Sequence, residues 1–143
     1  MTNQTLARAY LRKAIDRLDI LDLLHGKRAY SDVVREAQEI VELALKGMLR
    51  AVGVEPPKYH DVGGLLVEHA DRFTEVIRGD LARAANISKR LRKERELAFY
   101  GDIDFIPTEE YTAEDSQKAM DEAKWIVSLA QQSIKPVPVV SER

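Results

Sequence analysis

The sequence contains no cysteine, which excludes disulfide bonds and cysteine-based metal sites. It has no apolar run approaching the roughly 20 residues that a membrane-spanning helix needs. The opening residues Met-Thr-Asn-Gln do not resemble a signal peptide, so we expect a cytoplasmic protein without a membrane segment. No alternating strand pattern, internal repeat, low-complexity tract or phosphate-cradling glycine loop is present.

The composition is that of a helix-rich protein, with 45% hydrophobic and 32% charged residues in a chain of 143. A chain of this length is expected to form one domain with its own core. The formal net charge of -2 averages two unlike regions. Residues 83–95 are basic, with Glu94 as their only acid, whereas residues 102–122 are acidic, with Lys118 as their only base. This asymmetry is compatible with a partner surface or with two solvated faces.

Apolar residues recur at helical spacing along most of the chain. We expect helices over residues 3–25, 31–52, 61–74 and about 80–99, and a final helix that begins after Thr112. The widest apolar stripe belongs to residues 31–52, which predicts that this helix is central. The pattern predicts an all-α, antiparallel four-helix up-and-down bundle with a short additional helix. The domain is expected to span residues 1–134, followed by a C-terminal tail over 135–143.

Particular residues are expected to mark the helix ends. Gly26 is well placed to end the first helix, and Ser31 can cap the second. Thr112 can cap the last helix, with Asp115 three residues later as its capping-box partner.

The long basic helix carries the most informative pattern. Its apolar face is formed by residues at spacings of three and four: Leu81, Ala84, Ser88, Leu91, Arg95 and Ala98. A guanidinium on this face needs partners, because an unpaired buried charge is costly. Arg95 can pair with an acid, hold a phosphate through two hydrogen bonds, or stabilise a pentavalent phosphate during RNA cleavage. Tyr100 can donate to the same phosphate, stack on a base, or close the helix end as a half-buried ring.

The remaining candidates favour structural roles. His25 lies at the end of an apolar stripe, His69 lies in mid-helix, and His60 precedes a helix, so none is spaced as a metal ligand with another. The acidic loop could hold a divalent cation, but its spacing matches no calcium loop and favours a solvated loop. Its carboxylates are Asp102, Asp104, Glu109 and Glu110. We expect no metal and no cofactor.

Three stretches together resemble the HEPN-domain family, over about residues 5–132. They are the helix 30–49, the segment from Gly53 to Leu66 with its Pro-Pro-Lys-Tyr-His-Asp run, and Arg92…Arg95-Glu-Leu-Ala-Phe-Tyr-Gly101. The resemblance implies a helical bundle that dimerises along the helix that carries the last of these stretches, expected over about residues 80–99. It also implies a metal-independent RNase site in active members, where an arginine is followed after four to six residues by a histidine.

The histidine of that motif is missing here. Counting from Arg95, positions 100–102 hold Tyr100, Gly101 and Asp102, and counting from Arg92 also gives no histidine. Tyrosine does not replace imidazole as a proton shuttle near neutral pH, because its unperturbed pKa is about 10.

The resulting hypothesis is a homodimeric module associated with a nucleotide or RNA and with a nucleotidyltransferase partner. Its binding residues are Lys89, Arg92, Arg95 and Tyr100. One alternative is a metal-independent endoribonuclease toxin with a variant site, in which Arg95 and Tyr100 are catalytic or His60 takes the proton role. Another is a helical dimer whose arginines are structural.

Overall fold

The computed structural model describes residues 2–58, 61–100 and 111–134, except for the side chains of residues 95–100. Helices account for most of this part of the chain, and it contains no strand. The helices are α1 (Asn3–Gly26), α2 (Tyr30–Ala51), α3 (Val62–Glu68), the 3-10 turn η1 (Ala70–Arg72), α4 (Glu75–Arg78), α5 (Leu81–Tyr100) and α7 (Ala113–Ser133). The all-α fold is therefore confirmed.

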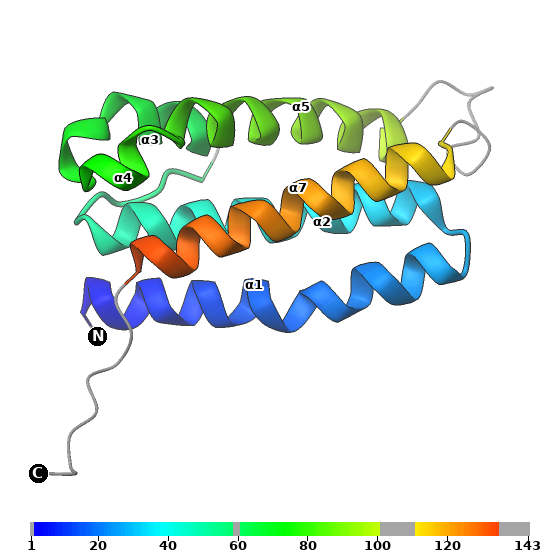
Figure 1. The fold of residues 1–143 in the computed structure, drawn as a ribbon, viewed down its shortest axis with the longest axis horizontal. Helices are drawn as coiled ribbons and strands as arrows, with labels where there is room; N and C mark the ends of the chain where they lie inside the picture. Colours follow the sequence, from blue (N-terminus) through cyan, green and yellow to red (C-terminus); the bar gives the residue numbers. More distant parts are fainter. Residues whose placement is uncertain (1, 59–60, 101–110, 135–143) are drawn as a thin grey trace, which may run out of the picture.

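The four long helices run in alternating directions along the long axis of the molecule (Figure 1). Helix α2 packs against α1, α7 and α5, as its wide apolar stripe predicts. Helix α5 packs mainly on α2 and α3 and contacts α7 only slightly. The arrangement is therefore less symmetric than the expected bundle, because α5 is attached through α2 and α3.

The core is built around α2. Four of its large side chains are fully buried: Ile40, Leu45, Met48 and Leu49. Gly47 allows α1 to approach closely, because a Cβ there would lie 3.1 Å from the Ala7 carbonyl oxygen. Because α1, α5 and α7 pack closely against α2, the backbone of α2 holds the side chains on its remaining face in fixed positions.

The apolar face predicted for the basic helix is buried as far as its side chains are described. Leu81, Ala84, Ser88 and Leu91 are each at most 6% exposed. Helix α3 crosses α5 closely at Gly63, where an added Cβ would lie 2.8 Å from the Ala85 Cα. The missing side chain of Gly63 therefore has a packing role.

Two predictions about local structure were wrong. The single helix expected over 61–74 is divided, because η1 follows α3 and Phe73 is extended, with ψ of 157°. Arg78 stabilises this break by donating to the carbonyls of Ala70 and Phe73. Ser31 does not cap α2: the N-cap is Ala29, without a side-chain hydrogen bond, and Ser31 is buried inside the first turn.

The predicted ends of the first and last helices agree better with the structure. Helix α1 ends at Gly26, although the left-handed residue of the turn is Arg28, with φ of 62°. The capping box of Thr112 and Asp115 is confirmed at the start of α7. Just before it, the Tyr111 hydroxyl donates to the Glu94 carbonyl at 3.0 Å and fastens this end of α7 to α5.

Candidate functional site

The cations of α5 are divided between two flanks of the helix. On the α7 side, the Arg83 guanidinium lies 3.9 Å from the ring centroid of Trp125. On the same side, Arg90 forms an ion pair with Glu122 of α7. These two arginines connect neighbouring helices, so their contacts support a structural role.

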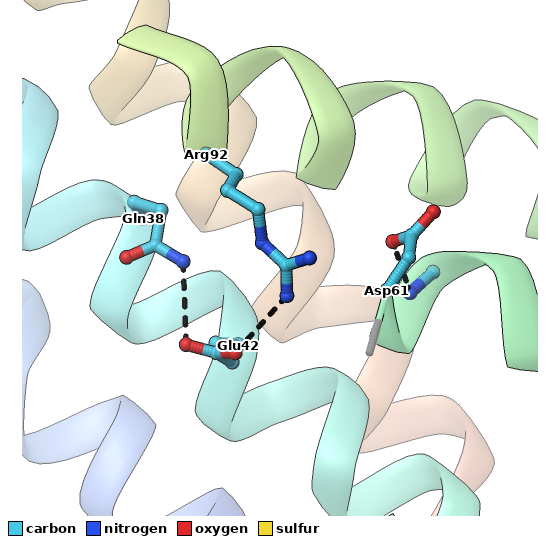
Figure 2. A network of polar contacts seen from close by, with 5 residues as sticks. Gln38, Glu42, Asp61 and Arg92 are labelled. Atoms are coloured by element: carbon cyan, nitrogen blue, oxygen red, sulfur yellow. Dashed lines mark hydrogen bonds and ion pairs between the residues drawn. The ribbon is translucent and has the colours of Figure 1, made fainter. Parts of the chain in front are cut away.

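On the other flank, Arg92 lies above the polar edge of α2. Its Nη2 is 3.5 Å from Oε1 of Glu42, and Oε2 of Glu42 accepts a hydrogen bond from Gln38 Nε2 at 3.2 Å (Figure 2). The side chains of Arg92 and Glu42 are 34% and 23% exposed, whereas Gln38 is buried. The three side chains form a polar network between α5 and α2, and one side of this network is accessible to solvent.

Figure 2 also includes Asp61, which caps α3 by accepting a hydrogen bond from the Gly63 N–H at 3.1 Å. This cap fixes the start of α3 against α5. Together with the close approach at Gly63, it positions the part of α5 that precedes Arg92.

Two lysines extend the positive charge along the same helix. Lys89 and Lys93 are exposed and form no hydrogen bond or ion pair with another described residue. Lys89 lies three positions before Arg92 and four positions before Lys93, so its side chain is a neighbour of both on the helix surface. We call Lys89, Arg92 and Lys93 the basic row.

The two residues expected to be catalytic are placed only by their backbone. Arg95 and Tyr100 belong to α5, but their side chains lie outside the described part of the structure. Arg95 follows Arg92 by three positions on α5. His60 and the acidic loop residues Asp102, Asp104, Glu109 and Glu110 are also outside the described residues.

Two cavities lie away from the basic row. One of about 220 Å³ lies between α5 and α7, and its lining includes Arg90, Glu94, Tyr111 and Lys118. The other, of about 310 Å³, lies where α2 and α7 end and is lined in part by Arg72 and Phe73. Neither cavity is lined by a residue of the basic row, so the row lies on the surface of α5 outside both cavities.

The described histidines have structural surroundings. His25 Nδ1 lies 2.8 Å from the hydroxyl of Ser116, which is fully buried, and the His25 ring packs against Tyr30 with centroids 5.6 Å apart. His69 is the C-cap residue of α3. Among the described residues, no group of three or more histidines and carboxylates could hold a metal ion, and no helix is long and apolar enough to cross a membrane.

Sequence reasoning missed Gln38 and Glu42 as members of the candidate site. Both lie where the apolar stripe of α2 meets its polar face, and they are four positions apart, so they share one edge of the helix. This spacing was the available signal. Their relation to Arg92 depends on how α2 and α5 cross, which neither segment encodes locally.

The fold and the basic row define a helical-bundle protein with cationic side chains along one flank of α5. A family model for the HEPN domain matches residues 7–134, and the chain belongs to the HEPN family. No curated protein and no solved structure is significantly similar to the chain. Membership of this family implies a function related to nucleotides or RNA.

Proposed function

We propose that this protein binds the phosphate groups of RNA or a nucleotide along α5 as a non-catalytic HEPN module. The observation that carries the proposal is the basic row, in which Lys89, Arg92 and Lys93 are adjacent on the accessible flank of one helix. Phosphate attracts such a row through its charge, and a guanidinium adds directional hydrogen bonds.

The residues have different roles in this proposal. Arg92 contacts a phosphate directly, while Lys89 attracts the polyanion and adds a second charge. Arg95 and Tyr100 extend the contact toward the end of α5, where the tyrosine donates a hydrogen bond or stacks on a base. Arg83 and Arg90 are not given this role, because they lie on the other flank of α5, where they contact Trp125 and Glu122 of α7.

Binding without cleavage follows from the altered motif. The sequence has the arginine of the family motif but no histidine at the expected positions. Without an imidazole, the site lacks a group that both accepts and donates a proton near neutral pH.

The first test measures RNA binding by fluorescence anisotropy with a short labelled single-stranded RNA. Arg92→Ala is expected to weaken binding several-fold while circular dichroism and the urea midpoint change little. The control is Arg12→Ala, which removes the same charge from an exposed pair with Asp16 on α1. Equal binding by wild type and Arg92→Ala would refute the proposal, and equal losses in both variants would reduce it to non-specific charge attraction.

A second test separates binding from catalysis. Wild type and Arg95→Ala are incubated with an RNA mixture in EDTA, which removes metal-dependent contaminating nucleases. We expect no cleavage by either protein. Cleavage by wild type alone would instead establish a metal-independent endoribonuclease with a variant site, and Tyr100→Phe would then test whether the tyrosine takes part.

We further propose a homodimer and a nucleotidyltransferase partner, both supported by family membership. Light scattering after size exclusion should give twice the mass of the 143-residue chain. A monomer at every concentration tested would contradict the dimer. Co-expression with the nucleotidyltransferase encoded nearest to this gene tests the partner by co-purification.

A further inference from the structure

The Glu42 carboxylate lies where it faces the cation that the proposed function assigns to phosphate. One of its oxygens accepts from the Gln38 amide at 3.2 Å, and the other lies 3.5 Å from the Arg92 guanidinium (Figure 2). Gln38 is 4% exposed and lies on the same helix as Glu42. The buried amide therefore restrains the carboxylate near Arg92.

A carboxylate and a phosphate present similar groups to a guanidinium. Both are anions with adjacent oxygens that accept its N–H donors. The distance of 3.5 Å between Arg92 Nη2 and Glu42 Oε1 is longer than the roughly 2.7–2.9 Å of a strong charge-assisted hydrogen bond. The pair is also partly solvated, with side-chain exposures of 34% and 23%. A contact of this kind is weak enough to be exchanged for another anion.

A phosphate that approaches Arg92 meets Glu42 in addition to the guanidinium. Because the Gln38 amide holds one carboxylate oxygen, Glu42 stays close when its contact with Arg92 is broken. The phosphate must then replace an existing anion and tolerate a like charge nearby. Lys89 and Lys93 differ from Arg92 in this respect, because neither forms an ion pair with an acid in the described part of the chain.

We propose that Glu42 is a built-in competitor for the phosphate that Arg92 binds, and that it lowers the affinity of the site. The inference rests on the proposed phosphate-binding function and adds its regulation. A ligand must displace Glu42 before it binds Arg92, and contacts with the rest of the basic row compensate for this cost in affinity. A phosphate that contacts Arg92 alone therefore binds weakly.

The test measures the dissociation constant of a short fluorescein-labelled single-stranded RNA for the full chain and four variants. Glu42→Gln keeps the size of the side chain and an oxygen that can accept from Arg92, but it removes the charge. We expect binding to tighten about two- to fivefold, the range that corresponds to a weak, partly exposed ion pair. The control Glu36→Gln removes a carboxylate from the same helix, where Glu36 pairs with Arg17 of α1 at 3.4 Å.

The double variant Glu42→Gln with Arg92→Ala tests whether the effect passes through Arg92. If Glu42 competes for that guanidinium, its neutralisation in the Arg92→Ala background should change affinity no more than Glu36→Gln does. Urea midpoints measured for every variant confirm that each one is folded under the binding conditions.

The outcomes distinguish this inference from the function on which it rests. Weaker or unchanged binding by Glu42→Gln, together with a loss in Arg92→Ala, would overturn competition and leave phosphate binding intact. Unchanged binding by Arg92→Ala would refute the proposed function itself. Binding that appears only in Glu42→Gln supports competition, whereas no binding by wild type or by Glu42→Gln overturns both.

Discussion

Replacing either of the two adjacent glycines at the start of α3 with alanine should affect the stability of the protein differently. A Cβ at Gly63 would lie 2.8 Å from Cα, 3.2 Å from the carbonyl oxygen and 3.3 Å from Cβ of Ala85. Because the first two are backbone atoms of α5, no side-chain rotation relieves the contact. At Gly64, the nearest atom is Oδ2 of the Asp61 side chain, at 3.3 Å, whereas the capping hydrogen bond is accepted by Oδ1, so a small shift of Oδ2 relieves the contact.

The magnitude follows from two opposing effects. Alanine is a better helix former than glycine by up to about 1 kcal/mol. Overpacking costs about 1–3 kcal/mol, and carbon atoms normally lie roughly 3.5–4.0 Å apart, so α3 and α5 must separate at Gly63. We expect Gly63→Ala to lower the free energy of unfolding by about 1–2 kcal/mol. Gly64→Ala should leave it unchanged or raise it by less than about 1 kcal/mol.

Urea unfolding followed by far-ultraviolet circular dichroism measures both variants against wild type. The midpoints should shift in opposite directions or diverge clearly, while the slope stays constant. A Gly63→Ala protein as stable as Gly64→Ala would refute the close crossing of α3 and α5. The same result would remove the argument that α3 fixes the position of the basic helix.

Three further substitutions test other parts of the bundle by the same unfolding assay. Thr112→Ala removes one half of the capping box and should cost about 1 kcal/mol, and an unchanged midpoint would show that the cap contributes little. Leu45→Ala creates a cavity at a fully buried position and should cost about 2–5 kcal/mol, so a loss below about 1 kcal/mol would contradict its central place in the core. Ser116→Ala removes the partner of His25 between α1 and α7 and should cost about 1–3 kcal/mol, whereas a stability equal to wild type would make the 2.8 Å contact dispensable.

The sequence is most informative where structure depends on residues close together in the chain. The capping box at Thr112 involves residues three positions apart, and the apolar stripe of α2 follows from helical periodicity. These features were predictable, because a helix fixes the direction of each side chain relative to its neighbours. The buried face of α5, from Leu81 to Leu91, follows from the same rule.

Prediction fails where the structure depends on contacts other than the regular three- and four-residue spacing within one helix. Ser31 has the chemistry of a cap, but the turn after α1 places Ala29 at that position and buries the serine. The break at Phe73 depends on hydrogen bonds from Arg78 to carbonyls five and eight residues earlier. The pairing of Arg92 with Glu42 spans 50 positions in the chain and requires the crossing of α2 and α5.

The two sides of α5 are attached by different forces. Buried apolar side chains join it to α2 and α3, whereas the ends of long side chains join it to α7, through Arg83 on Trp125 and Arg90 with Glu122. Added salt screens charge attraction and leaves apolar burial largely intact. Added salt therefore weakens the charge contacts between α5 and α7, while the apolar contacts that hold α5 on α2 are kept. The neutral hydrogen bond from the Tyr111 hydroxyl to the Glu94 carbonyl still joins α7 to α5 when those charge contacts are screened.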